Sequence, residues 1–259
     1  MRLGMRLLAI WLAFGGGSAT GHFNMLLPQN ASAKKGEALT ITYQWGHPFE
    51  HQLFDAPKPR SLVVVGPDGK RVDWTDKLEK TALKVAGKEI ATYQLSFTPG
   101  QRGDYLLVLK TPPIWLEEDG AFVEDTVKTV LHVQTQRGWD GSAGQFEFVP
   151  LTRPYGLSPG TVFQVEMPGR AHEDALSLVE IERYNRAPPK ALPPEEQITR
   201  TVRLDRNGVA TTTLPEAGWW CLTVSRPHGM RERDGKSHPV RQRSTFWVLV
   251  DEPEKEKNR

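Results

Sequence analysis

Short runs in which apolar and polar residues alternate follow one another along most of the chain. In the run 38–45, Leu39, Ile41 and Tyr43 share one face of an extended strand, because successive side chains of a strand point to opposite faces. Glycine and proline separate the runs at short intervals, which is typical of strands joined by turns. We predict strands at 37–45, 61–65, 71–74, 89–97, 104–110, 125–134, 145–150, 161–167, 176–184, 198–204, 210–213, 219–225 and 244–250. A weak helical pattern covers 74–86 only, so the pattern predicts an all-β fold.

Two segments of the chain share one order of residues: proline, a short turn, glycine, an aromatic residue and an apolar strand. The first contains Pro99 and Tyr105, and the second contains Pro215 and Trp220. This order is typical of a late strand in immunoglobulin-like sandwiches. A polar, glycine-rich stretch at 136–144 lies between the two segments. We therefore predict two immunoglobulin-like β-sandwich domains in tandem, at 22–138 and 139–251, followed by a charged tail at 252–259.

The first residues have the organisation of a cleavable signal peptide, predicted at 1–21. Arg2 and Arg6 precede an apolar run at 7–14, and small residues follow up to Gly21. The run is shorter than the roughly 20 residues that a membrane span needs. Ala19 and Gly21 suit positions −3 and −1 of a cleavage site, which would make His22 the first mature residue. We expect a periplasmic protein with no membrane span in its mature chain.

The charge and cysteine content remove several classes of function. The chain has 33 Lys and Arg and 31 Asp and Glu, and two arginines lie in the predicted signal peptide, so the mature chain is balanced. A balanced charge gives no case for a nucleic-acid partner. The single cysteine, Cys221, lies in an apolar run and is expected in the core. No known catalytic motif is present, so we do not expect an enzyme.

Histidines at two places suggest a metal site. An N-terminal His22 offers an α-amine and an imidazole, which together can chelate a transition metal. His47 and His51 follow the run at 37–45, and Pro48 disfavours a helix there, so we expect them in a loop. Neutral imidazole suits nickel, cobalt, copper and zinc, and affinity should fall below about pH 6 as imidazole protonates. Further candidate ligands are Glu50, Asp55 and, at the ends of a basic loop at 226–239, His228 and His238.

A strand-pairing argument joins the two places. If 22–28 forms a strand antiparallel to 37–45, with the centre of the pair between Lys34 and Lys35, His22 lies opposite His47. Three imidazoles and an amine would then converge at one end of the first domain. The alternative interpretation of the segment at 46–51 is an ordinary surface turn.

Several segments also resemble a known family. They are 22–28, 46–50, 145–150, 157–160 and 217–224. In this order they resemble a bacterial family of unknown function associated with the periplasmic component of cobalt and nickel uptake systems. In that family the mature protein starts near a histidine and a Gly-His motif ends an early strand, and His22 and His47 match these positions. The resemblance implies a nickel-transport-associated protein that binds nickel or cobalt and has a membrane metal transporter as partner.

Two other functions remain open at this point. The sandwiches could form a structural or adhesive module that binds a protein or glycan partner through exposed aromatic residues. A copper redox enzyme that uses His22 as half of a chelating brace is a further alternative. Saturable binding of a metal by the mature protein would separate the metal-binding hypothesis from the adhesive one.

Overall fold

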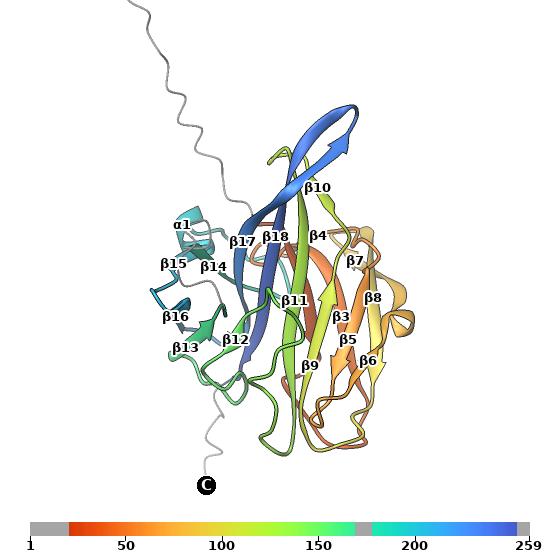
Figure 1. The fold of residues 1–259 in the computed structure, drawn as a ribbon, viewed down its shortest axis with the longest axis vertical. Coiled ribbons are helices and arrows are strands. Elements are labelled where there is room, and N and C mark those ends of the chain that lie inside the picture. The colour runs from red at the N-terminus through yellow and green to blue at the C-terminus, as the bar shows by residue number, and fades with distance from the viewer. Residues whose placement is uncertain (1–20, 169–177, 253–259) are drawn as a thin grey trace, which may run out of the picture.

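The computed structural model describes residues 21–168 and 178–252, and it is built almost entirely of strands (Figure 1). Residues 1–20 of the predicted signal peptide and 253–259 of the charged tail lie outside this range. Within the described residues the helices are a single 3-10 turn, η1 (Thr75–Lys77), and the short α1 (Glu195–Ile198). No helix among them is long and apolar enough to cross a membrane. The predicted all-β class is confirmed.

A five-stranded sheet carries the N-terminal strand of the described chain. Its order is β1 (Phe23–Pro28), β3 (Leu39–His47), β8 (Lys88–Phe97) and β7 (Glu79–Val85), with β4 (Gln52–Phe54) paired to β3. Leu39, Ile41 and Tyr43 of β3 are buried, as their alternation predicts.

The weak helical pattern at 74–86 was misleading. That segment forms η1 and then β7, which pairs with β8 along its whole length. Ala86 and Gly87 join the two strands with φ angles of 47° and 82°. Two consecutive positive φ values suit the tight turn of a hairpin. The turn and the pairing therefore override the helical periodicity of the sequence.

A ten-stranded sheet forms the largest element of the fold. Two short strands, β10 (Ile114–Leu116) and β2 (Ser32–Ala33), pair with its strand β11. The path of the other strands is β15 (Arg200–Arg203), β14 (Leu178–Arg183), β17 (Gly218–Arg233), β18 (Lys236–Val250), β11 (Ala121–Val133), β9 (Gly103–Lys110), β5 (Ser61–Val65) and β6 (Arg71–Asp73). The third sheet contains β12 (Val149–Pro150), β13 (Thr161–Glu166) and β16 (Val209–Leu214).

The ten-stranded sheet joins the two predicted domains. β11 of the first half pairs in parallel with β18 of the second, from Phe122 opposite Val240 to Thr129 opposite Trp247. Two separate sandwiches in tandem are therefore not confirmed, because one sheet runs across the expected boundary at 136–144. Turn patterns predict strands and hairpins, but they carry no information on a pairing between strands so far apart in sequence.

The central strands β17 and β18 of this shared sheet are buried on both faces. In β17, Trp219 and Cys221 belong to the core against the five-stranded sheet, whereas Trp220 and Leu222 belong to the core on the other side. β18 divides in the same way, with Trp247 in the first core and its neighbours in the second. A strand buried on both faces gives a continuous apolar run, which explains why the alternation is weakest here. Cys221 is a free, buried thiol, as expected.

The two repeated segments have the same local hydrogen bond. The Tyr105 hydroxyl donates to the carbonyl of Gln101 (3.2 Å), and Trp220 Nε1 donates to the carbonyl of Glu216 (2.8 Å). In each case the aromatic side chain reaches back four residues and fixes the turn before its strand. The repeated pattern in the sequence thus has a common structural role, within one sheet.

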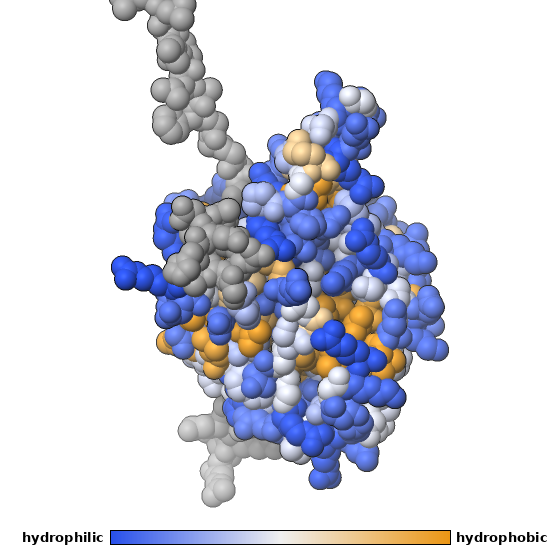
Figure 2. Space-filling model, viewed as in Figure 1, coloured by the Kyte–Doolittle hydropathy of each residue, from blue (hydrophilic) through white to orange (hydrophobic). Residues whose placement is uncertain are grey.

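The predicted basic loop at 226–239 is a β-hairpin instead. β17 and β18 stay paired out to Arg233 opposite Lys236, apart from an irregularity between Pro227 and Met230. The hairpin projects beyond the sheet as an arm (residues 226–241), which is mostly hydrophilic (Figures 1 and 2). Most side chains of the arm are exposed, which suits their polar composition, while His238 and Arg233 contact the ring of Trp115.

Candidate metal site

His22 and His47 lie side by side at one end of the five-stranded sheet. β1 and β3 are antiparallel, and Phe23 is opposite Gly46, so the next pair outward is His22 and His47. The centroids of the two imidazole rings are 4.3 Å apart. The pairing that the hairpin argument predicted for these two residues is confirmed.

Aromatic rings and a glycine shape the surroundings of this pair. The His22 ring lies 5.4 Å from the ring of Trp45 and 5.3 Å from that of Phe54, and the His47 ring is 5.6 Å from Phe54. Gly46 has a φ of 150°, and a Cβ at this position would lie 2.1 Å from the carbonyl oxygen of Gln52. The glycine of the Gly-His motif is therefore required where β4 folds back and pairs closely with the end of β3.

Side chains of the shared sheet hold the backbone of the first strand. Arg243 donates from Nη2 to the carbonyl of His22 (2.6 Å) and to Asp125 (3.0 Å), and Trp247 donates to the carbonyl of Asn24 (2.8 Å). Arg243 and Asp125 are both buried. Charge-assisted hydrogen bonds of this kind fix geometry strongly. These contacts could not be predicted from sequence patterns, because the partners come from strands more than 100 residues away.

The electrostatic setting of the pair suits a cation. Burial lowers the pKa of His47, and the nearby carboxylates of Glu50 and Glu118 raise it in part. A lowered pKa keeps the imidazole neutral at neutral pH, which leaves a nitrogen lone pair for a metal. Glu50 also has a buried Oε2 atom with no hydrogen-bond partner among the described residues. Glu118, in the turn between β10 and β11, was not expected near the histidines.

His51 does not join the pair. Its Nδ1 lies 2.9 Å from the carbonyl oxygen of Asn185, and its ring is 5.8 Å from that of Tyr184. The backbone of His51 has a φ of 53°, which turns the side chain toward the second half of the chain. Across 21–168 and 178–252, no three His, Cys, Asp or Glu side chains are grouped as a metal site. The expected convergence of three imidazoles is therefore not observed.

The remaining candidate ligands have other contacts. Asp55 accepts a hydrogen bond from the backbone of Ala91 (2.8 Å) and so joins β4 to β8. His238, in the projecting arm, packs against Trp115, and the centroids of the two rings are 4.7 Å apart. His228 lies in the irregular part of the arm, and His238 pairs with Arg231 rather than with His228.

The loop after β3 is fixed by the second half of the chain. Asn185 donates from its backbone to the carbonyl of Pro48 (3.0 Å) and from its side chain to that of Phe49 (2.6 Å). The buried carboxylate of Glu182 accepts from the Phe49 backbone (3.1 Å) and from Thr199 Oγ1 (2.5 Å). Burial raises the pKa of Glu182 to about 7. Glu50 is thus placed on a loop with little freedom. His47, which the sequence analysis expected in that loop, is instead the last residue of β3 and pairs with Gln52 of β4.

A comparison with family models identifies the family. The model of a domain of unknown function, DUF4198, matches residues 19–227. The chain belongs to the DUF4198 family. This confirms the part of the resemblance that concerns a family of unknown function. No curated protein matches the DUF4198 chain.

Solved structures resemble the DUF4198 chain only distantly. A DUF4785 family protein from Legionella pneumophila is 12% identical, with a TM-score of 0.29, and the match covers 77% of this chain and 51% of that one. Escherichia coli alpha-2-macroglobulin activated by porcine elastase is 14% identical, with a TM-score of 0.23 and coverage of 89% and 20%. The DIP-gamma IG1+IG2 structure is 9% identical, with a TM-score of 0.23 and coverage of 89% and 98%. The chain thus spans about half of the Legionella protein, and likeness at this level decides neither fold nor function.

Proposed function

We propose that this DUF4198 protein is a non-enzymatic periplasmic protein that binds nickel or cobalt for uptake by a membrane metal transporter. The observation that carries the proposal is the pair of imidazoles of His22 and His47, 4.3 Å apart at the end of β1 and β3. Cleavage of the predicted signal peptide after Gly21 adds the α-amine of His22 to the pair.

The ligands of the proposed site are three nitrogens. The amine and the imidazole of His22 form a chelate, and His47 supplies a second imidazole. The carboxylate of Glu50 adds negative charge near His47 but is not grouped with the two histidines as a ligand. Nitrogen ligands of this kind suit nickel(II), cobalt(II) and copper(II).

The choice of nickel and cobalt rests on the family resemblance. The ligand types alone predict a different order of metal affinities. Divalent copper binds nitrogen ligands more tightly than nickel or cobalt, following the general order of stability of such complexes. In vitro, copper should therefore bind with the highest affinity, and metal supply in the cell decides which ion is carried. Partial exposure of His22 is compatible with loading and release.

Calorimetric titration of nickel, cobalt, copper and zinc into the mature protein tests the proposal. We expect saturable binding of one ion per chain, weakened at least tenfold by either His22→Ala or His47→Ala. His132→Ala is the matched control, because His132 forms a hydrogen bond with Asp104 (2.7 Å) in another part of the fold. An absence of saturable binding would favour the structural or adhesive alternative. Oxidase activity of the copper form that disappears in His22→Ala would favour the redox alternative.

A further inference from the structure

A groove separate from the histidine pair runs along the outer face of the five-stranded sheet. Its volume is about 660 Å³, which is within the usual range of ligand pockets. β3 contributes Thr40, Thr42 and the buried Gln44, which alternate with the core residues Leu39, Ile41 and Tyr43 of that strand. Gln94 of β8, directly opposite Thr42, continues the polar surface. The floor of the groove is therefore a set of amide and hydroxyl side chains.

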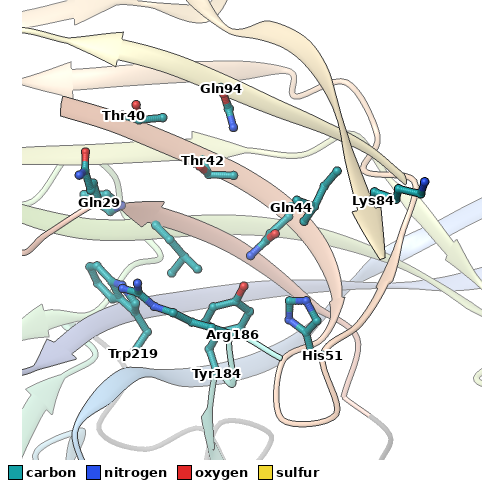
Figure 3. Close-up of a pocket in the computed structure, with 13 residues that line it drawn as sticks. Gln29, Thr40, Thr42, Gln44, His51, Lys84, Gln94, Tyr184, Arg186 and Trp219 are labelled. Atoms are coloured by element: carbon teal, nitrogen blue, oxygen red, sulfur yellow. The ribbon is translucent and has the colours of Figure 1, made fainter. Parts of the chain in front are cut away.

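The opposite wall comes from the second half of the chain. Figure 3 shows Tyr184, Arg186 and Trp219 on one side of the groove and the threonines of β3 on the other. Tyr184 of the wall and Gln44 of the floor both line the groove. His51 also lines this groove. Because its Nδ1 lies at the Asn185 carbonyl, its Nε2 is the ring nitrogen that remains as a polar atom of the wall. The histidine that the sequence assigned to a metal is therefore a groove residue.

The charge of the groove is positive. Lys84 and Arg186 line it, both are exposed, and none of its described lining residues carries a carboxylate. Arginine binds carboxylates through two parallel hydrogen bonds. Threonine and glutamine side chains both donate and accept hydrogen bonds, as sugar hydroxyls do. Apolar surface is supplied by Leu27, Leu83 and Trp219.

We propose that this groove binds an acidic oligosaccharide, with sugar hydroxyls on the floor and a carboxylate at Arg186 and Lys84. An extended peptide is a poorer match, because peptide strands bind to the edge of a sheet through main-chain hydrogen bonds, whereas this floor is a sheet face covered with side chains. The ring of half-buried Tyr184 offers a flat surface for the C–H face of a sugar. This site is independent of the metal site.

The test uses metal-free mature protein, so its result does not depend on the histidine pair. Tetragalacturonate, tetramannuronate and a hyaluronan tetrasaccharide are titrated by calorimetry, with methyl-esterified tetragalacturonate as the neutral match and tetraglutamate as the acidic peptide. We expect saturable binding of at least one acidic sugar. Methyl esterification of the carboxylates should weaken binding of that sugar at least tenfold. For tetragalacturonate, this compares the acid with its methyl ester. Tetraglutamate should bind at least tenfold more weakly than that sugar.

Variants locate the binding. Arg186→Gln should weaken it at least tenfold and Thr42→Val about fivefold, while Arg206→Gln, in an exposed turn outside the groove, should leave it unchanged. Thermal unfolding of each variant checks that the fold is kept. The proposal is overturned if none of the acidic sugars binds, if both groove variants bind like the wild type, or if tetraglutamate binds as tightly as the sugars.

Discussion

The ring centroids of His22 and His47 are 4.3 Å apart because β1 and β3 pair in one definite register. The hydrogen bonds of that pair set which residues face each other, and a slip of one residue would turn one histidine to the opposite face of the sheet. Arg243 fixes the outer end of β1 through the His22 carbonyl. The relationship between the two rings is therefore a property of the whole sheet pair and not of a local loop.

Arg243→Gln should destabilise the fold by about 3–5 kcal/mol, because the buried carboxylate of Asp125 loses its charge partner. It should also weaken metal binding, since His22 loses the contact to its carbonyl. The control is Arg241→Gln, two residues away, whose exposed ion pair with Asp119 (3.4 Å) should contribute less than about 1 kcal/mol. Urea unfolding measures both variants. Equal, small losses of unfolding free energy in the two variants would show that the Arg243–Asp125 pair does not hold β1 in place.

Gly46→Ala should disrupt the end of β3, because the new Cβ would lie 2.1 Å from the Gln52 carbonyl oxygen. We expect a large loss of stability and of metal affinity together. Gly36→Ala is the matched control: its φ of 83° also disfavours alanine, but nothing lies within 4 Å of the new Cβ. That variant should lose only about 1 kcal/mol from backbone strain. If both variants unfold at the same denaturant concentration, close approach of β4 is not the reason for the glycine.

Glu182→Gln should flatten the pH dependence of stability. The carboxyl has a pKa of about 7 in the folded protein against an ordinary value of 4.5, so the folded state favours its protonated form. Its contribution is complete below about pH 4.5 and is lost as pH rises through 7, by up to about 3 kcal/mol at about 1.4 kcal/mol per pKa unit. Unfolding at a series of pH values from 4 to 8 measures this.

A glutamine at 182 has no proton to lose, so the difference between wild type and variant should itself change with pH. The control Glu195→Gln, an exposed residue of α1, should follow the wild-type profile. A Glu182→Gln profile parallel to that of the wild type would contradict the raised pKa.

Exported protein should begin at His22. Sequencing the N-terminus of the mature protein tests this directly, and the basic, apolar and small-residue order of 1–21 is the reason for expecting it. Addition of one alanine before His22 should weaken metal binding, because the amine then belongs to another residue. A start several residues from His22 would remove the amine from the ligand set.

Much of the local structure could be predicted from the sequence. Strand alternation identified the buried face of β3, and hairpin symmetry placed His22 opposite His47. The repeated proline–glycine–aromatic order identified the turns that Tyr105 and Trp220 fix. These features depend on residues close in sequence, where backbone periodicity and turn chemistry decide the outcome.

The long-range features could not be predicted in the same way. The parallel pairing of β11 with β18, the contacts of Arg243 and the position of Glu118 all join segments distant in sequence. His51 was assigned to the metal site by its spacing from His47, whereas a positive φ and the Asn185 carbonyl direct it to the groove. Side-chain direction in a loop depends on partners that spacing does not specify.

X-ray absorption spectroscopy of the nickel-loaded mature protein tests the central claim most directly. We predict two imidazole ligands per nickel, with nitrogen distances of about 2.1 Å, and a single imidazole in His47→Ala. His132→Ala should give the wild-type spectrum. A wild-type spectrum without imidazole scattering, or one that His47→Ala leaves unchanged, would contradict the proposed site.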